Sequence, residues 1–247
     1  MKIAKVLLFI FPVVLFAVMI VYLAPRQENP LPAENKVQIS EQQQEEEEVL
    51  DSELSAGNFF EFPFAGSSYI YAVFEVKNTG NVNMELDTGE FCLYDAAGNL
   101  LDVVGLAQPY PHIIKPGEVA YYADAIANNY SEPISSIELQ RKASKTLEKC
   151  RYLDVSNASL VSKDSGLLKG ALTVKNNSGK LASVIYSCFV LRDQNQKVVA
   201  VLTNWDYENL QNGDSFSTSV NELSLTFEDL QAAGVTNLSV EAFAFTK

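Results

Sequence analysis

The sequence predicts an all-β fold in which two similar β-sandwich domains follow an N-terminal apolar segment and an acidic linker. Three observations predict it: an uncharged run near the amino terminus, a stretch rich in Glu, Gln and Pro after it, and a strand-and-turn pattern that occurs twice in the remaining chain. A chain of 247 residues with 47% hydrophobic residues can bury a sizeable core, and its length suggests one or two domains.

The first segment, residues 1–24, contains the uncharged run Val6–Ala24. A run of this length can cross a bilayer as a helix. Because Lys2 and Lys5 precede it, the positive-inside rule predicts a cytoplasmic amino terminus and an extracytoplasmic remainder. A proline directly after the run makes a poor cleavage site, which favours an uncleaved signal anchor over a cleaved signal peptide. We therefore expect a single-pass cell-membrane protein.

The second segment, residues 25–57, contains nine acidic and two basic residues, including the run Glu45–Glu48. Glu, Gln and Pro with few aromatic residues bury too little apolar surface to offset the entropy of ordering. The composition predicts a disordered, self-repelling linker that holds the folded part away from the membrane.

The remaining chain repeats itself at an offset of 98 residues. At this offset Ile70–Gly80 aligns with Leu168–Ser178, and Phe91–Asp95 aligns with Phe189–Asp193. A repeat of just under a hundred residues fits one immunoglobulin-like sandwich and is too long for a solenoid unit. We therefore predict two tandem domains of this type.

The domain boundaries follow from where the pattern starts and stops, and place the two domains at residues 58–146 and 147–247. Within each domain, apolar and other side chains alternate with a period of two, over Ile70–Val76 in the first and Leu168–Val174 in the second. This alternation predicts a strand with one buried face. The last strands are predicted at 136–143 and 237–245, and a short helix at Thr226–Gly234.

The aligned stretches at Phe91 and Phe189 each predict a hairpin. Asp95 precedes the turn Ala96–Asn99, and short acidic side chains commonly cap such turns by accepting hydrogen bonds from backbone N–H groups. The equivalent Asp193 precedes a turn without glycine, so we expect its backbone geometry to differ.

The pentapeptide Phe91-Cys92-Leu93-Tyr94-Asp95, with VKNTG before it and IKPGE after it, resembles the bacterial FxLYD domain. The second copy has Arg192 in place of the tyrosine and is similar to a diverged member. The resemblance extends over nearly all residues beyond 57. It implies an immunoglobulin-like fold in a bacterial cell-envelope protein, and it supplies no catalytic residues.

The residue types exclude several function classes. The net charge of −13 argues against nucleic-acid binding. His112 is the only histidine, which removes catalytic triads and multi-histidine zinc sites, and we expect it to be exposed. No phosphate-binding glycine loop or calcium loop occurs. The sequence therefore predicts no enzyme, cofactor or metal; a hydrolase using two of the many carboxylates is left as an alternative.

The three cysteines are too few for a disulfide scaffold. We expect Cys92, Cys150 and Cys188 to be buried thiols, and a bond between Cys150 and Cys188 is left open because an extracytoplasmic protein permits it.

The best candidate for a binding surface is aromatic. Trp205, the only tryptophan, lies two residues before Tyr207 on what should be a loop or sheet edge, and Tyr110 is equivalent to Tyr207 in the first copy. Aromatic rings with Asp and Asn beside them can stack on sugars or anchor a protein partner. The sequence thus predicts a non-enzymatic envelope protein that binds an unidentified partner; a carbohydrate- or cell-wall-binding module using Trp205 and Tyr207 is the alternative.

Overall fold

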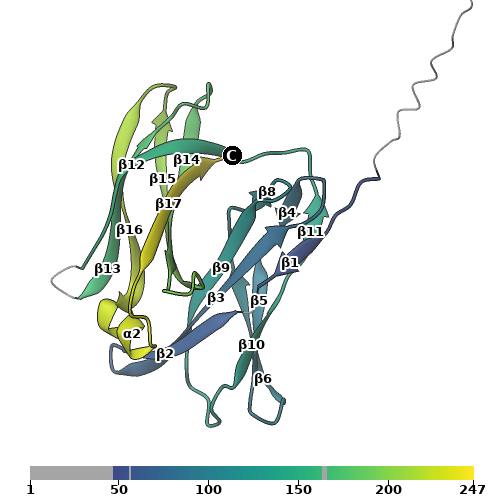
Figure 1. Cartoon of the computed structure of the whole chain (residues 1–247), viewed down its shortest axis with the longest axis vertical. Helices are drawn as coiled ribbons and strands as arrows, with labels where there is room; N and C mark the ends of the chain where they lie inside the picture. Colours follow the sequence, from purple (N-terminus) through teal and green to yellow (C-terminus); the bar gives the residue numbers. More distant parts are fainter. Residues whose placement is uncertain (1–46, 56, 163–165) are drawn as a thin grey trace, which may run out of the picture. The chain divides into compact units, whose positions relative to one another are not determined.

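A computed structural model describes residues 47–55, 57–162 and 166–247 (Figure 1). The predicted membrane segment 1–24 and the predicted linker as far as residue 46 lie outside the described residues. Within the described ranges, no helix is long and apolar enough to cross a bilayer.

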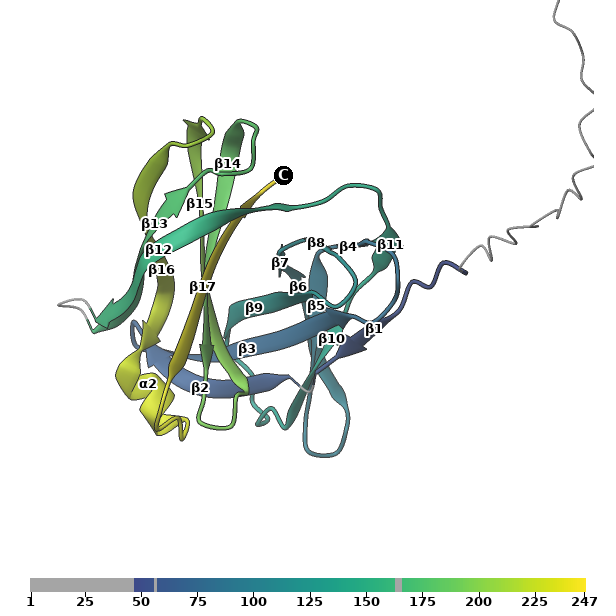
Figure 2. The same cartoon turned by 45° about the horizontal axis from the view of Figure 1, so that its top comes forward.

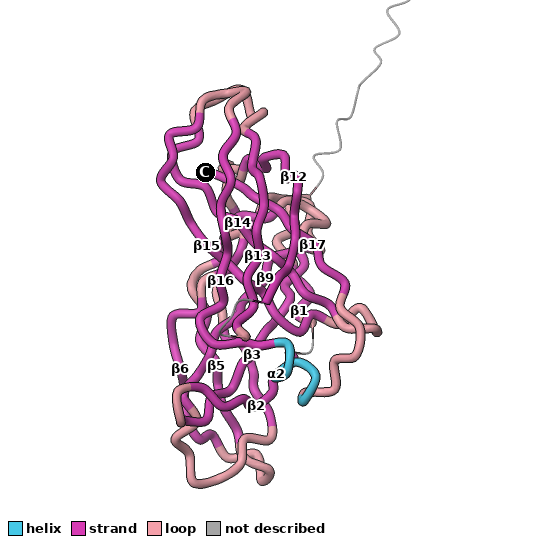
Figure 3. Tube along the Cα trace, turned by 90° about the vertical axis from the view of Figure 1, so that its left-hand side faces the viewer, coloured by secondary structure: helices cyan, strands magenta, loops and turns pink. Residues whose placement is uncertain are grey.

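The described chain is mostly β-structure in antiparallel sheets, as the sequence predicts, and Figure 3 shows one short helix among its strands. We call residues 52–145 the first half. Its strands are β1 (Ser52–Leu54), β2 (Asn58–Phe64), β3 (Ser67–Asn78), β4 (Met84–Leu86), β5 (Gly89–Tyr94), β6 (Leu100–Ala107), β7 (Pro109–Tyr110), β8 (Ile113–Ile114), β9 (Val119–Ala127), β10 (Ser136–Gln140) and β11 (Ala143–Lys145).

Three sheets make up the first half. One has the order β1-β3-β9-β7 with β2 also paired to β3, one has the order β10-β5-β6, and one has the order β11-β4-β8. The last strand predicted at 136–143 is therefore two short strands, β10 and β11, which pair in different sheets.

We call residues 151–246 the second half. Its elements are β12 (Arg151–Ser162), β13 (Leu167–Lys175), β14 (Ala182–Arg192), β15 (Val198–Leu210), β16 (Ser215–Thr226), α2 (Phe227–Ala232) and β17 (Ser239–Thr246). The strand order is β15-β14-β17-β12-β13-β16. The long strand β12 lies between β17 and β13 (Figure 2). Its first residues pair with β17, and the rest of the strand pairs with β13. No described ladder joins the two halves, and the predicted domain boundary falls between β11 and β12.

The folded chain begins earlier than the sequence predicts. Ser52–Leu54, inside the predicted linker, forms β1 and pairs with the end of β3. Before it, the Asn81 side chain accepts a hydrogen bond from the Val49 N–H at 2.7 Å. Gly80 has no side chain to block this approach, since a Cβ there would lie 2.1 Å from the Val49 carbonyl oxygen. The polar composition of this segment did not indicate a strand. Backbone hydrogen bonds to β3, and not the burial of apolar side chains, keep β1 in place.

A buried asparagine occurs at the same position in both copies. Asn78 and Asn176 are fully buried. The Asn78 amide donates to the carbonyl oxygens of Val82 and Ile114, and the Asn176 amide donates to those of Lys180 and Leu210. Each side-chain oxygen also accepts a backbone N–H two residues on. Because every polar atom has a partner, this residue can lie in the core and fix the turn after the strand.

The two hairpin turns are alike, contrary to the sequence-based expectation for the second. Asp95 accepts hydrogen bonds from the N–H groups two and four residues later, and Asp193 does the same. Where the first turn uses Gly98 at φ +80°, the second uses Gln196 at φ +64°. The second turn therefore has the same shape as the first. Its backbone is more strained at Gln196, because a residue with a Cβ adopts a positive φ less readily than glycine does.

The helix predicted at Thr226–Gly234 is confirmed as α2. Thr226 is the N-cap, and its side chain and that of Asp229 form a reciprocal capping box. Gly234, at φ +85°, follows the helix and reverses the chain toward β17.

The apolar core of the first half is formed by the inner face of β3, with Ile70, Ala72, Phe74 and Val76, packed against Phe91 and Leu93 of β5. The outer face of β3 is buried as well: Tyr71 is 0% exposed and Val73 is 1% exposed. Both belong to one apolar cluster with buried residues of β14 and β15. The prediction of one buried face is therefore wrong for β3, because the second half covers its outer face.

The strand β13 follows the prediction. Leu168, Leu172 and Val174 are buried, and the alternating residues are partly exposed. Gly170 lies on the buried face, where a Cβ would come within 2.4 Å of the Phe189 ring. A larger residue at this position would displace the central aromatic side chain of the second core.

Candidate functional site: an aromatic row

Four aromatic side chains stand in one row across the second-half sheet. Trp205 of β15 is opposite Tyr186 of β14, Tyr186 is opposite Phe245 of β17, and Phe245 is opposite Tyr152 of β12. Directly opposed residues in adjacent strands project from the same face of a sheet. The Tyr186 and Phe245 rings are stacked, with centroids 5.0 Å apart and planes 11° apart. We call these four residues the aromatic row.

The middle of the aromatic row is covered by the first half. The Tyr110 ring meets the Tyr186 ring edge-on at 6.3 Å, and the His112 ring lies 6.4 Å from the Phe245 ring. His112 is thus half-buried, which corrects the expectation that it is exposed. Its Nε2 atom is buried without a hydrogen-bond partner in the described structure, and burial lowers the pKa of the imidazole to about 4, aided by the charge of Lys247.

The first end of the aromatic row is open. Trp205 is 53% exposed and Tyr207, on the same face of β15, is 72% exposed. The two rings are in contact, with centroids 5.1 Å apart and planes at 85°. The sequence placed Trp205 on a loop or sheet edge, and it lies on β15, an edge strand.

The polar neighbours of Trp205 lie on the other face of β15. The Asp206 side chain accepts hydrogen bonds from Asn204 at 3.2 Å and from the Thr218 hydroxyl at 2.9 Å. Asn204 also donates to the Ser219 carbonyl oxygen of β16. Because strand residues alternate between faces, these groups do not flank the Trp205 ring. The prediction that Asp and Asn flank the aromatic rings is therefore wrong for Asn204 and Asp206, which lie on the opposite face of the strand.

The three predicted site residues are divided by the fold. Trp205 and Tyr207 form the open end of the row, whereas Tyr110 is partly buried against Tyr186. Tyr152, Tyr186 and Phe245 were missed, because their alignment depends on the register of strands distant in the sequence. The one signal available was that both Tyr152 and Phe245 lie in short aromatic-containing segments near the ends of the second copy.

The second end of the aromatic row opens into a cleft of about 450 Å³ between the halves. Tyr121 of β9 meets Phe243 of β17 at 6.3 Å, and Phe243 meets Tyr152 at 6.4 Å. Burial raises the pKa of Tyr121 to about 12, so its hydroxyl stays protonated at neutral pH. The lining consists of Gly117, Glu118, Val119, Tyr121, Tyr152, Arg192, Glu241 and Phe243.

Arg192, which stands in the second copy where the first copy has Tyr94, connects the halves. Its guanidinium donates to the Glu75 carboxylate at 2.8 Å and to the Tyr121 hydroxyl at 3.0 Å. Both partners belong to the first half. Nearby, the Tyr71 hydroxyl donates to the carbonyl oxygen of Val201 and accepts from its N–H, each at 3.1 Å. Tyr71 thereby satisfies outward-facing backbone groups of the edge strand β15.

The cysteines are buried thiols, as the sequence predicts, and none is in a disulfide. Cys150 and Cys188 belong to one apolar cluster with Ile113 and Phe245. Cys188 is on β14 and Cys150 directly precedes β12, with β17 between these strands. Since two strand spacings are about 9.6 Å, the two Cα atoms exceed the roughly 7 Å limit for a disulfide. The bond left open by the sequence is therefore not made in this fold.

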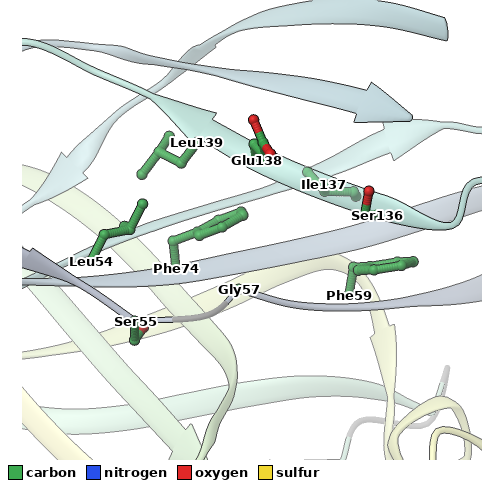
Figure 4. A pocket seen from close by; sticks show the side chains of 9 residues that line it. All are labelled: Leu54, Ser55, Gly57, Phe59, Phe74, Ser136, Ile137, Glu138 and Leu139. Carbon is green, nitrogen blue, oxygen red and sulfur yellow. The ribbon is translucent and has the colours of Figure 1, made fainter. Parts of the chain in front are cut away.

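A separate groove of about 660 Å³ lies between β10 and the β1–β2 edge of the first half. Figure 4 shows the side chains of Phe74 and Ile137 facing this groove. Gly57 is part of its wall, and a Cβ there would lie 2.3 Å from the Phe74 ring. The groove is mostly apolar, and Glu138 is the ionisable residue in its lining. It is distinct from the aromatic row.

Among the residues that the structure describes, no group of three or more His, Cys, Asp or Glu side chains is placed to hold a metal ion. No known family model matches this chain, and no curated protein matches it.

Proposed function

We propose that this chain is a non-enzymatic binding protein of the bacterial cell envelope. In this proposal residues 1–24 anchor it in the cell membrane with a cytoplasmic amino terminus. The linker then displays two immunoglobulin-like sandwiches of the FxLYD type on the extracytoplasmic side. The anchor is supported by the uncharged run and its flanking lysines. The repeated fold is supported by the matching asparagine and turn contacts of the two copies.

The observation that carries the binding function is the exposed pair Trp205 and Tyr207. A tryptophan that is 53% exposed beside a tyrosine that is 72% exposed leaves a large apolar area in water. Tryptophan and tyrosine are the residues most enriched at the energetic centres of protein interfaces. The pair also sits on a strand that is hydrogen-bonded to β14, so little backbone conformational entropy would be lost when a partner covers it.

The geometry favours a protein partner over an extended glycan. The two ring planes are at 85°, so they do not form one flat platform for successive sugar rings. The amide and carboxylate on either side of Trp205 in the sequence, on Asn204 and Asp206, are bonded to β16 on the other face. A protein side chain can pack into the angle between perpendicular rings, as edge-to-face aromatic pairs allow.

The test is affinity capture with the full chain in detergent from bacterial envelope extracts, followed by direct titration of the captured protein. Calorimetry measures the affinity of every variant, since Trp205→Ala lacks the only tryptophan of the chain and has no indole fluorescence to follow. We expect Trp205→Ala to weaken binding by about 30-fold, the effect of a typical hot spot. Leu106→Ala is the matched control, since Leu106 is 78% exposed but lies on β6 of the first half. Equal affinity of the Trp205→Ala variant would contradict the proposal.

The alternative function is binding of a cell-wall carbohydrate by the exposed Trp205 ring alone. It is favoured by the exposure of that ring, because one sugar can stack on one indole face. Soluble peptidoglycan fragments would then change the Trp205 fluorescence in a saturable manner, and Trp205→Phe would retain part of the binding. Saturable binding of this kind, without a protein partner in the capture experiment, would replace our proposal by this one.

A further inference from the structure

The cleft at the second end of the aromatic row is a separate candidate for a ligand site. Its volume of about 450 Å³ is within the range of small-molecule pockets. Three rings line it: Tyr121 is buried at 5% exposure, whereas Tyr152 is 37% exposed and Phe243 is partly exposed. Trp205 and Tyr207 do not line this cleft.

The rings of this cleft already accept cations from the protein itself. The Lys115 ammonium lies 5.5 Å from the centroid of the Tyr152 ring and 3.0 Å from the Glu118 carboxylate. The Arg192 guanidinium lies 5.9 Å from the centroid of the Tyr121 ring and pairs with Glu75. Each internal cation thus combines a ring face with a carboxylate, which is the combination that stabilises cations on aromatic rings.

One carboxylate of the cleft remains without such a cation in the contacts that the structure describes. Lys115 pairs with Glu118, and Arg192 pairs with Glu75. Glu241, an exposed residue on β17 two positions before Phe243, is in no described ion pair. The cleft-lining Glu118, Arg192 and Glu241 together with the ion-pair partners Lys115 and Glu75 therefore sum to one negative charge. The net charge of −13 for the whole chain would further raise the local concentration of cations.

We propose that this cleft binds a small organic ammonium ion, with the cationic head against the Tyr152 and Phe243 rings and its charge balanced by Glu241. The inference is independent of the proposed binding function of the Trp205 and Tyr207 pair. Failure of one would leave the other intact, since the two surfaces share no lining residue.

The test is a choline titration of the full chain in an uncharged maltoside micelle. Nuclear magnetic resonance of isotope-labelled tyrosine rings monitors the titration. The variant Tyr152→Phe assigns the Tyr152 signal and keeps a ring face. We expect saturable shifts of the Tyr152 signal with a millimolar dissociation constant, since contacts with two rings and one carboxylate act together. The neutral isostere 3,3-dimethylbutan-1-ol should bind at least about tenfold more weakly, because it lacks the charge.

Variants separate the ring and the carboxylate. We expect Glu241→Gln to weaken choline binding about fivefold, the loss of one exposed charge contact. Glu61→Gln, which removes an exposed carboxylate outside the cleft, should have no effect. Calorimetry should show that Tyr152→Phe retains binding and that Tyr152→Leu, checked for folding by circular dichroism, loses it. Equal binding of choline and its neutral isostere, or no saturation by roughly 50 mM choline, would overturn the proposal.

Discussion

The strands β3 and β13 occupy the same position in the two copies, yet their outer faces differ. Both bury the same inner positions, with Ile70 and Leu168 each 0% exposed. On the outer face, Tyr71 is 0% exposed, whereas the equivalent Lys169 is partly exposed. The same contrast separates Tyr110, packed against Tyr186, from its equivalent Tyr207. The copies therefore share an interior and differ where the first half packs on the second.

The largest effect expected from this comparison is that of Tyr71→Ala. Removing a fully buried ring, together with both hydrogen bonds to Val201, should reduce the free energy of unfolding by about 3–5 kcal/mol. Chemical denaturation of the full chain measures it. Lys169→Ala, the same position in the second copy, should change stability by less than about 0.5 kcal/mol. Similar losses in the two variants would show that the outer face of β3 is not buried in solution.

The second expected effect concerns the inner face, where the copies differ by one methyl group. Ala72 of the first copy is equivalent to Gly170 of the second, whose Cβ would lie 2.4 Å from the Phe189 ring. Gly170→Ala should therefore lower stability by about 1–3 kcal/mol through overpacking. In a Phe189→Leu background the added cost of Gly170→Ala should shrink. A purely additive double-mutant cycle would mean that the two side chains do not compete for space.

The third prediction tests the packing of His112 against the aromatic row through pH. Burial lowers the pKa of folded His112 to about 4, below the ordinary value of 6.5. The unfolded chain then binds the proton more readily, so the stability from neutral His112 is complete above pH 6.5 and is lost as pH falls toward 4. Thermal unfolding of His112→Leu should lack this part of the pH dependence. An unchanged profile in that variant would place His112 in water.

The smallest expected effect is at the hairpin turns. Gln196→Gly should raise stability by up to about 1 kcal/mol, because glycine adopts φ +64° without steric strain. Gly98→Gln in the first copy should lower stability by a similar amount, and no atom lies within 4 Å of its Cβ position to complicate the change. Differential thermal unfolding of the two variants measures both. Shifts of the same sign would show that the turns are not equivalent.

The features predicted correctly from the sequence are those set by local chemistry. The turn at Asp95 follows from a short acidic side chain, and the end of α2 follows from Gly234. The strand β13 follows from a clear alternation. For β3, the residues Tyr69–Phe74 are all apolar, and a continuous apolar run indicates a strand that is buried on both faces. Interpreting this run as an alternation of period two led to the wrong prediction of one buried face.

The aromatic row could not be predicted to the same extent. Trp205 and Tyr207 were found because the only tryptophan of the chain lies two residues before a tyrosine, with Asp and Asn beside them in the sequence. Tyr186, Phe245 and Tyr152 join them only through the register of three ladders. Tyr152 and Phe245, which are nearly a hundred positions apart in the sequence, meet in this way. A single sequence does not show which residues of distant strands pair.

No described ladder joins the two halves, so side-chain packing, a few side-chain hydrogen bonds and the connecting segment between β11 and β12 hold them together. Leu147, 88% exposed between β11 and β12, marks a point where the chain could be cut without breaking a strand. Two fragments produced there would each keep their hydrogen-bonded sheets. Each would expose the apolar surface that the other half covers in the intact chain. Expressed together, the two fragments should associate through these surfaces, and co-purification would show the reassembled pair.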